Sequence, residues 1–316
     1  MRCSVRSSTG FSLIEILVVV FIIGVLVALT LPAVQYSRAA SRNVSCSANL
    51  RQLGIACGNY LSANGTFPAG MTAYSHLSMF VALLPYLDSV NLHNSINMSM
   101  QLNNNADADL ARISNETAFQ STIGILICPE QRDSERNAGS TTYAGNGGFD
   151  LQSGRFNGVF SGENPRKIVS PASILDGMSQ TALFTEWIVN PIGSQDRLAT
   201  VFNTKDFLAA DEYDSFVEAC RSITFETSNF NNVKMAHWAR GNNGETIYTH
   251  DLSLNENTCL NNHSINYGAF TAGSRHASTA NMLACDGSVH SIKKSTSLPV
   301  WRSLGSRDGG DIVDGF

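Results

Sequence analysis

The sequence predicts an α+β protein in which one long N-terminal helix packs on a mainly antiparallel β-sheet that carries an irregular insertion. Three observations lead to this prediction. An apolar run occupies residues 11–31, a helical spacing of apolar residues continues to about residue 63, and short strand-like runs separated by Gly, Asn and Pro make up the rest. A chain of 316 residues has room for one such domain and an extension.

Composition narrows the class of protein. Apolar residues make up 43% of the chain, which excludes wholesale disorder, and charged residues make up only 15%, below the ~25% of an average soluble domain. Lys and Arg total 21 against 26 for Asp and Glu, so the formal net charge is −5. Because nucleic-acid-binding proteins usually present a basic face, this balance argues against nucleic acid as a partner.

The apolar run is long enough to span a membrane. Its only clearly polar side chains are Ser12, Glu15 and Thr30, and ~20 apolar residues in a helix cross a bilayer core. Arg2 and Arg6 precede the run, and positive charge before a first span keeps that end in the cytoplasm. We therefore expect a single-pass protein of the cytoplasmic (inner) membrane whose bulk lies outside the cytoplasm.

Two simpler interpretations of this run compete. A secretory signal peptide would end in small residues, but here the run leads into Pro32, which fits a cleavage site poorly. A plain membrane anchor would leave Glu15 unexplained. A carboxylate is costly inside an apolar run, so Glu15 indicates a function.

The helix is expected to continue past Pro32 as an amphipathic segment over residues 34–63. Apolar residues recur there at intervals of four, three, four and four, at Cys46, Leu50, Leu53, Cys57 and Leu61. We expect this stripe to pack on the rest of the chain, and Asn64-Gly65 to end the helix.

The remaining elements are shorter. We expect helices at Ser78–Leu87 and Asp107–Gln120, a loop at Asn91–Asn105, strands at Ile123–Ile127, Thr141–Gly148 and Gln180–Val189, and an insertion of mixed structure at residues 190–262. Two strand-like runs, Met282–Cys285 and Ser288–Ile292, flank Asp286-Gly287. Asp-Gly readily adopts the positive φ of a two-residue turn, so this segment predicts a β-hairpin.

Gly10-Phe11-Ser12-Leu13-Ile14-Glu15, with its basic leader and apolar run, resembles the processing motif of type IV prepilins and type II secretion pseudopilins. The resemblance implies that a prepilin peptidase and N-methylase removes residues 1–10 by cutting between Gly10 and Phe11, and that Phe11 is then methylated. It also implies a transmembrane helix over residues 11–33 and an exported, pilin-like globular domain over residues 34–316. Pro32 matches a proline that often bends the pilin helix.

Within that resemblance, Glu15 is the fifth mature residue and matches the family's glutamate. In a fibre, the apolar helices of the subunits stack into a dry central bundle. A free α-amine there would be an unpaired charge, which a neighbour's Glu15 carboxylate can pair. We expect such a pair to set the register of the subunits more than it stabilises them.

The C-terminal part carries a second resemblance. His276 is followed by nine residues and then Asp286-Gly287. With the prepilin motif, this resembles the DUF1559 family, whose H-X9-DG region corresponds here to residues 266–316. Further matching stretches are Leu31–Gln35, Cys46, Asn49–Gly54, Asn59-Tyr60, Phe67-Pro68, Leu84–Leu87, Cys128-Pro129, Asp176–Thr181 and Ser274–His276. The resemblance implies processing with prepilins and assigns no catalytic activity to His276.

A structural role for His276 is the expectation, with Asp286 making the turn and His276 bonding the adjacent hairpin. The alternative is that His276 and Asp286 form a catalytic pair or part of a metal site. A metal ion needs three or four ligands, and the other histidines show no ligand spacing. We expect those histidines in surface or Asn-rich loops; they are His93, His237, His250 and His263. We expect no enzyme activity and no cofactor. Calcium stays open, because some pseudopilins bind it and Asp308-Gly309-Gly310-Asp311 or Asp211-Glu212 offer oxygen ligands.

Six cysteines lie beyond the leader, in a compartment that permits disulfides. Cys46 and Cys128 match the family pattern, which implies the first pair. Cys220 and Cys259 bracket much of the insertion and form the second predicted pair. Cys57 and Cys285 are expected to be buried thiols.

We therefore expect a pilin-like or pseudopilin-like structural subunit of a type IV pilus or a type II secretion-like fibre, with the peptidase, other pilin-like subunits and the membrane as partners. A membrane-tethered module that binds a ligand such as a glycan, without fibre assembly, is the alternative. An extracytoplasmic hydrolase that uses His276 and Asp286 is a third hypothesis.

Overall fold

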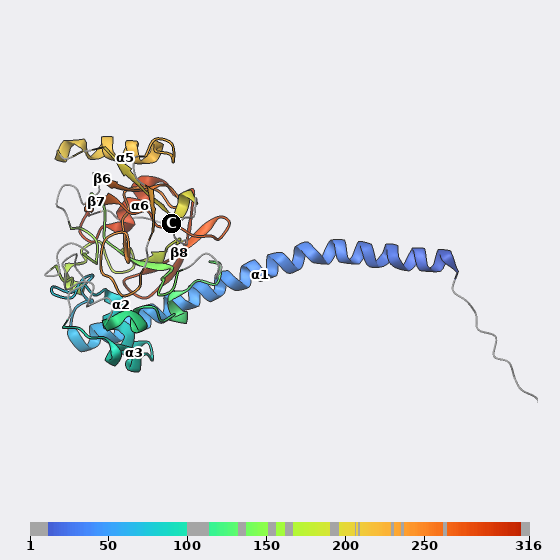
Figure 1. Cartoon of the computed structure of the whole chain (residues 1–316), viewed down its shortest axis with the longest axis horizontal. Coiled ribbons are helices and arrows are strands. Elements are labelled where there is room, and N and C mark those ends of the chain that lie inside the picture. Colours follow the sequence, from blue (N-terminus) through green and yellow to red (C-terminus); the bar gives the residue numbers. More distant parts are fainter. Residues whose placement is uncertain are drawn as a thin grey trace, which may run out of the picture.

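The computed structural model describes residues 12–99, 114–131, 137–150, 156–161, 167–189, 196–205, 207, 209–228, 231–234, 237–261 and 264–310. One long helix, α1 (Leu13–Asn64), reaches far beyond a body built from two sheets and short helices (Figure 1). The chain is thus an α+β protein, as the sequence predicts.

The second half of α1 packs against the body. Its buried residues are Cys46, Leu50, Leu53, Ala56 and Cys57, which follow the predicted stripe, while Leu61 is only half-buried. The helix ends at Gly65, which has a φ of 73° and donates its N–H to the carbonyl oxygen of Leu61. Glycine reaches this left-handed conformation without steric cost, which is why it ends so many helices.

No part of the chain that the structure describes buries the first half of α1. Residues 12–38 are exposed throughout, and an 18-residue window of α1 has a mean hydropathy of 3.0 with none of it buried. A helix that is apolar all round needs an apolar environment, and this one is long and apolar enough to cross a membrane.

Short helices cluster beside the C-terminal end of α1. They are α2 (Met79–Leu83), η1 (Leu84–Tyr86), α3 (Val90–Ser95) and a helical stretch at residues 114–119. The helix predicted at Ser78–Leu87 is confirmed. The loop predicted at Asn91–Asn105 is wrong over α3, and its part beyond residue 99 lies outside the described residues, as does Asp107–Ile113 of the helix predicted at Asp107–Gln120.

The strand predicted at Ile123–Ile127 is also wrong. This run forms a 3₁₀ turn, η2 (Gly124–Leu126), in which the N–H of Leu126 bonds to the carbonyl of Ile123 at 2.9 Å. A compact apolar run is ambiguous between a strand and a buried turn. Here Leu126 is fully buried in the cluster that covers α1, so the run serves as core without joining a sheet.

A five-stranded sheet supports α1. Its strands, in the order β5-β1-β2-β8-β9, are β5 (Ile247–Tyr248), β1 (Tyr143–Asn146), β2 (Ala182–Glu186), β8 (Thr279–Ala284) and β9 (Val289–Lys293). All neighbouring pairs are antiparallel except β1 with β5. The predicted strands at Thr141–Gly148 and Gln180–Val189 contain β1 and β2.

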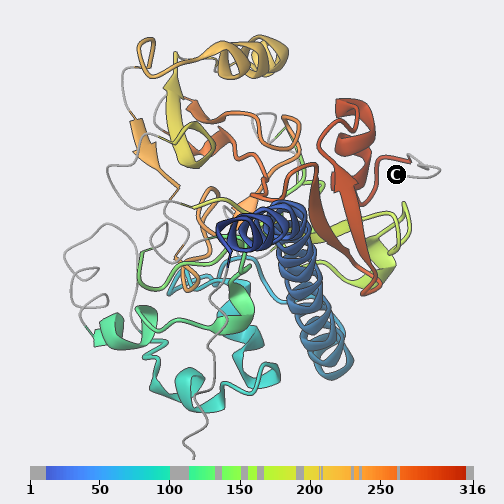
Figure 2. The ribbon, with the colours of Figure 1, turned by 90° about the vertical axis from the view of Figure 1, so that its right-hand side faces the viewer.

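Strands β8 and β9 form the predicted hairpin, which lies beside α1 (Figure 2). Leu283 pairs with Val289, and the N–H of Ala284 bonds to the carbonyl of Ser288 at 2.8 Å across the turn. The hairpin approaches the helix closely at Gly54, where a Cβ atom would stand 3.0 Å from Cδ1 of Leu283 and 3.4 Å from Cα of Gly287.

The predicted insertion supplies three strands of a second sheet, β3, β4 and β6, and β7 directly after it completes the order β4-β3-β6-β7. They are β3 (Thr200–Thr204), β4 (Asn231–Val233), β6 (Thr258–Asn261) and β7 (Ser264–Ala269), and α5 (Tyr213–Ser222) packs on them at the far edge of the body from α1 (Figure 1). Residues 190–262 are therefore more regular than expected, and they also supply β5 to the first sheet. The remaining short helices are η5 (Pro171–Ser173), η6 (Arg197–Ala199), η7 (Ala210–Glu212) and α6 (Leu298–Gly305).

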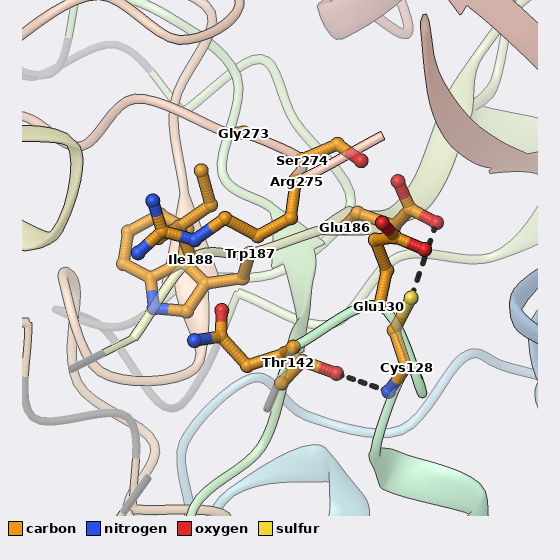
Figure 3. A pocket seen from close by; sticks show the side chains of 10 residues that line it. Cys128, Glu130, Thr142, Glu186, Trp187, Ile188, Gly273, Ser274 and Arg275 are labelled. Atoms are coloured by element: carbon orange, nitrogen blue, oxygen red, sulfur yellow. Dashed lines mark hydrogen bonds between the residues drawn. The ribbon is translucent and has the colours of Figure 1, made fainter. Parts of the chain in front are cut away.

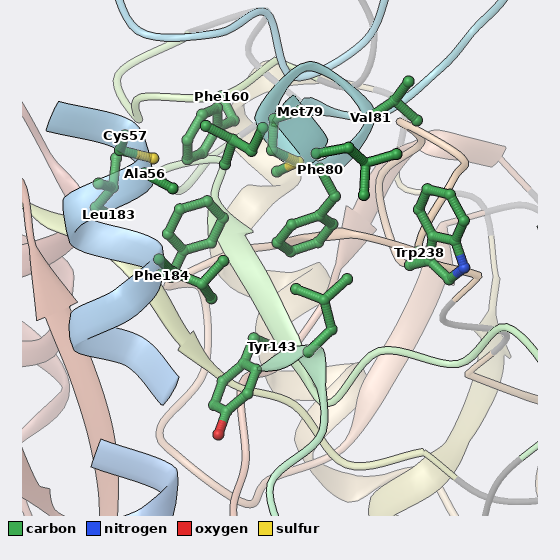
Figure 4. Packing of buried hydrophobic residues seen from close by; sticks show 14 of the residues in the cluster. Ala56, Cys57, Met79, Phe80, Val81, Tyr143, Phe160, Leu183, Phe184 and Trp238 are labelled. Atoms are coloured by element: carbon green, nitrogen blue, oxygen red, sulfur yellow. The ribbon is translucent and has the colours of Figure 1, made fainter. Parts of the chain in front are cut away.

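The largest core lies between α1, α2 and the first sheet. Figure 4 shows Ala56 and Cys57 of α1 facing Leu183 and Phe184 of β2. Phe184 stacks on Phe80 of α2 with ring centroids 5.4 Å apart. Such aromatic burial is among the largest single contributions to core stability, so the second half of α1 is an integral part of the domain.

Candidate functional site

The processing motif lies at the free end of α1. Gly10 and Phe11 fall outside the described residues. Within the described part, Oε2 of Glu15 accepts the backbone N–H of Ser12 at 2.8 Å, so this carboxylate satisfies one of the unpaired donors at the start of the helix. Pro32 lies inside α1, in its exposed half.

The Asp286-Gly287 turn forms as expected. The carboxylate of Asp286 accepts hydrogen bonds from the N–H of Ser288 at 2.9 Å and from its hydroxyl at 2.6 Å. Gly287 has a φ of 89°, a value that disfavours any residue with a Cβ. Asp286 therefore acts as a turn residue.

The expected bond to the hairpin is not made by the His276 ring, although the backbone carbonyl of His276 accepts from Nζ of Lys294, which directly follows β9. The ring of His276 lies at the end of β2, where Nε2 is 3.2 Å from Oε1 of Glu186. Nδ1 lies 3.7 Å from Oε2 of Glu130, and Nε2 lies 3.6 Å from Sγ of Cys128. His276 is only 5% exposed, so the motif's histidine and its Asp-Gly turn serve two separate places.

Both predicted disulfides form. Cys46–Cys128 joins α1 to the loop after η2, beside His276, and Cys220–Cys259 joins α5 to β6. Cys57 and Cys285 are free and buried, as expected, and burial raises the pKa of both thiols well above their ordinary value. Buried thiols with raised pKa values are poor nucleophiles.

Two glutamates complete the surroundings of the first disulfide. Glu186 accepts the N–H of Asn281 at 3.1 Å and its side-chain amide at 2.9 Å. Glu130 pairs with Nε of Arg42 on α1 at 2.6 Å. The Arg42 guanidinium is always charged, so it balances the charge of the Glu130 carboxylate where α1 meets the body. The hydrogen bond to Glu130 raises the pKa of Arg42 further.

Sequence reasoning missed Glu130, Glu186 and Arg42. A signal for Glu186 exists, because it is the one charged residue in the apolar run Ala182–Val189, and a buried charge needs a partner. Nothing in the local sequence marks Glu130, which follows Cys128-Pro129 in a short turn. Its role depends on the fold that brings α1 beside this loop.

The cluster has donor chemistry that suits a metal ion. Cys46, Cys128, Glu186 and His276 each offer one ligand atom, and these atoms lie within 4.8 Å of one another. The cavity beside them has a volume of about 10 Å³, close to the size of one water molecule. Figure 3 shows its lining, with Glu130, Glu186 and Cys128 on one side and Trp187 and Arg275 on the other. This cavity is too small for a sugar or another organic ligand.

The two segments considered for calcium have other contacts. Asp308 lies 3.5 Å from Arg307, Gly309 and Gly310 donate their N–H groups to Asp176, and Asp311 lies outside the described residues. Glu212 accepts the N–H of Ala209 at 2.9 Å at the start of η7. In the described part of the chain, neither segment gathers a set of convergent oxygen ligands.

One histidine expected at the surface lies in the core. His250 is fully buried, and its Nδ1 lies 2.6 Å from the carbonyl oxygen of Trp301 while Nε2 lies 3.0 Å from the Tyr248 hydroxyl. Burial lowers its pKa to about 3, so the ring is neutral at pH 7. His250 is therefore a core residue that joins β5 to α6.

Comparisons with known protein families match two consecutive parts of the chain. The model of a family described as "Protein of unknown function (DUF1559)" matches residues 35–298. The prokaryotic N-terminal methylation motif matches residues 5–31. No curated protein and no solved structure matches the chain. The methylation motif implies processing by a prepilin peptidase and association with a membrane.

Proposed function

This chain belongs to the DUF1559 family and carries a prepilin-like N-terminus, and we propose that it is a pilin-like structural subunit that assembles with other pilin-like subunits into a fibre, either a type IV pilus or a type II secretion-like pseudopilus. The observation that carries the proposal is the state of α1. Its first half is apolar all round and exposed along its whole length, and a glutamate stands near its start. A simple anchor needs only the apolar surface.

Before assembly, the protein is a single-pass protein of the cytoplasmic membrane in this proposal. Arg2 and Arg6 hold the leader inside, and the body lies outside. After the leader is cut off, the apolar half of α1 leaves the bilayer for the dry centre of the fibre. Helix–helix contacts there replace lipid contacts. The apolar surface of α1 is therefore kept from water both in the membrane and in the fibre.

Glu15 has a defined task in this assembly. In the single chain its carboxylate bonds to the N–H of Ser12 in the first turn of α1. In the fibre it pairs with the α-amine of a neighbouring subunit, an unpaired charge that the dry core would otherwise not tolerate. Since the pair forms only when two helices are in register, it selects one packing of the subunits.

A structural role is proposed in place of a catalytic one because His276 and Asp286 take part in separate contacts. The alternative of a tethered glycan-binding module finds no support at the His276 cluster, whose cavity has the size of one water molecule. That alternative needs the span but not Glu15, so one residue distinguishes the two functions.

The experiment follows the full chain in its native host. Intact mass of the membrane fraction should show a chain that begins at N-methylated Phe11. Glu15→Ala should be cut normally but should be lost from the sheared fibre fraction by at least tenfold. Thr30→Val, which replaces another polar residue of the same apolar run, is the matched control and should assemble as wild type.

Two results would overturn the proposal. A chain that keeps Met1, or begins after Pro32, would contradict prepilin-type processing. Glu15→Ala protein that is cut, stays in the membrane and behaves as wild type in every fraction would favour the tethered module.

A further inference from the structure

We propose that the Cys46–Cys128 disulfide is a closed form of a metal site, and that its reduction opens a binding site for one zinc-class divalent ion with Cys46 Sγ, Cys128 Sγ, Glu186 Oε1 and His276 Nε2 as ligands. Two thiolates, one imidazole and one carboxylate are a donor set that Zn²⁺ takes in tetrahedral geometry. All four ligand atoms lie within 4.8 Å of one another.

Three of these atoms already have the spacing that a metal requires. His276 Nε2 lies 3.2 Å from Glu186 Oε1, Cys128 Sγ lies 3.6 Å from His276 Nε2, and Cys128 Sγ lies 3.8 Å from Glu186 Oε1. A tetrahedral zinc ion with ordinary bond lengths places nitrogen and oxygen ligands ~3.3 Å apart and sulfur ~3.5 Å from either of them. One face of the coordination tetrahedron is therefore formed before any ion enters.

The bond between the two sulfurs holds the fourth ligand atom, Sγ of Cys46, too close to Sγ of Cys128 for both to bind one ion. Two thiolate ligands of one zinc ion lie ~3.8 Å apart, so the sulfur of Cys46 must move away from that of Cys128. Once the disulfide is reduced, no covalent bond opposes that movement.

The outer contacts of the cluster hold the ligands as metal sites usually do. Zinc-binding histidines place their second ring nitrogen against a carboxylate, and ligating carboxylates are themselves hydrogen-bonded. Nδ1 of His276 lies 3.7 Å from Glu130, which Arg42 pairs. Asn281 donates both its N–H and its side-chain amide to Glu186.

The second disulfide of the chain provides an internal comparison. Cys220–Cys259 lies in an apolar cluster with Phe202, Phe216, Val217, Leu252 and Ala269. A disulfide that only links two elements can be buried among apolar side chains, because it carries no charge that needs a partner. Cys46 and Cys128 also belong to an apolar cluster, but beside them the fold buries Glu186 and His276, with side-chain exposures of 3% and 5%. Burying these polar groups is costly, and a linking disulfide does not require it.

The chemistry of opening is balanced. A dithiol reductant transfers two electrons and two protons to the Cys46–Cys128 bond, giving two thiols, and becomes a disulfide itself. The ion then binds as both thiols lose their protons to solvent, while His276 binds as the neutral imidazole through Nε2. The ion and the two thiolates are neutral together, Glu186 adds one negative charge, and Glu130 stays balanced by Arg42.

A bound ion would maintain the connection between α1 and the body. Its ligands come from α1, from the loop after η2, from the end of β2 and from the segment before β8, so the ion would tie the same helix to the same body as the disulfide does. The protein would keep α1 attached to the domain under both oxidising and reducing conditions.

The test uses the full chain in detergent micelles. The protein is reduced with dithiothreitol, passed under argon through a column that removes the reductant, and titrated with ZnCl₂. Reduced wild type should bind one zinc ion per chain, and the oxidised protein should bind at least tenfold more weakly. CoCl₂ in place of zinc should give the absorption of tetrahedral cobalt with thiolate ligands, which reports the geometry directly.

Variants separate this site from the other thiols. His276→Ala and Glu186→Gln should each weaken zinc binding by at least tenfold, and Glu130→Gln by about tenfold, as outer ligand partners do. Cys57→Ala with Cys285→Ala removes the other buried thiols, and Cys220→Ala with Cys259→Ala removes the other disulfide. Both double variants should still bind one ion.

Reduction removes a cross-link between α1 and the body, so the melting temperature is followed in parallel. Zinc should raise the melting temperature of the reduced wild type and leave that of reduced His276→Ala unchanged. The proposal is overturned if zinc neither binds nor stabilises the reduced wild type, or if binding survives both His276→Ala and Glu186→Gln. Fibre assembly is not a readout here, so the outcome is independent of the proposed function.

Discussion

Nε2 of His276 lies 3.2 Å from Oε1 of Glu186, at the point where the segment before β8 meets the end of β2. This contact connects the histidine of the H-X9-DG motif to the joint between α1 and the body, since the Cys46–Cys128 disulfide and the Arg42–Glu130 pair lie beside it. The motif thus stabilises two places at once. Its histidine contacts Glu186 beside the disulfide that joins α1 to the body, and its Asp-Gly turn brings the hairpin against α1.

Glu186 should be important for stability in the oxidised protein. Glu186→Ala removes an acceptor for two donors of Asn281. Its side-chain amide keeps the hydrogen bond to Oδ1 of Asn43, but its buried N–H loses the Glu186 carboxylate, and losing a buried hydrogen-bond partner typically costs ~1–3 kcal/mol. Glu186→Gln keeps one carbonyl oxygen and should cost less. Glu218→Ala is the control, because the Glu218 side chain is exposed and pairs with Arg221 one turn away on α5. Thermal unfolding of the full chain in detergent measures all three, and equal effects of Glu186→Ala and Glu218→Ala would contradict the prediction.

Two glycines of α1, one helical turn apart, should respond in opposite ways. A Cβ atom at Gly54 would lie 3.0 Å from Leu283 and 3.4 Å from the backbone of Gly287, whereas Gly58 has nothing within 4 Å. Gly54→Leu should therefore push the hairpin from the helix and destabilise by ~1–3 kcal/mol. Gly58→Leu should stabilise slightly, because leucine favours helix more than glycine does. Melting temperatures decide, and a stable Gly54→Leu protein would show that the hairpin does not depend on this contact.

Gly287 tests the turn itself. Its φ of 89° excludes β-branched residues, although open space surrounds its Cα. Gly287→Val should therefore lower the free energy of unfolding by ~1–3 kcal/mol through backbone strain alone. Gly287→Asn should be tolerated better, since asparagine visits positive φ more readily. If both variants melted at the wild-type temperature, the turn would not need its glycine.

The sequence was most informative where a pattern is local. The helical spacing of the apolar residues predicted α1 and its buried stripe, and Asn64-Gly65 predicted where the helix ends. The Asp-Gly turn predicted the hairpin of β8 and β9. Family resemblance supplied the Cys46–Cys128 pair. The helix and the hairpin depend on residues close together in the chain, whereas the two cysteines are 82 residues apart and could be paired only through the resemblance.

The site could be predicted only in part, because it depends on contacts distant in the chain. His276 was singled out, but its partners Glu186 and Glu130 stand on elements that only the complete fold brings together. The strand expected at Ile123–Ile127 is wrong for a related reason: an apolar run shows that it is buried, but it does not show whether a neighbouring strand is free to pair. The second sheet was missed because its short strands alternate with polar, Asn-rich turns that obscure their periodicity.

Lys234 should make stability depend on pH. Its side chain is 2% exposed, its ammonium lies 4.3 Å from the centre of the Trp187 ring, and it donates to the carbonyl oxygen of Thr271 at 2.8 Å. Burial lowers its pKa from 10.5 to about 7, with Arg275 and Arg197 lowering it further and Asp196 opposing them. Between these two pH values the unfolded chain binds more protons than the folded chain, so the free energy of unfolding rises with pH from about 7 to 10.5.

Lys234→Met removes this dependence and should reveal its sign. Below pH 7 the folded wild type carries a buried ammonium, so the variant should be more stable than wild type at pH 6, by a few kcal/mol. As pH rises toward 10 the wild-type amine becomes neutral in the fold, and the gain should shrink and then reverse, because the variant lacks the hydrogen bond to Thr271. Lys205→Met changes an exposed lysine at the end of β3 and should show no such trend. Melting temperatures from pH 6 to pH 10 give the answer, and a gain that stays constant across this range would mean that Lys234 keeps an ordinary pKa in the fold.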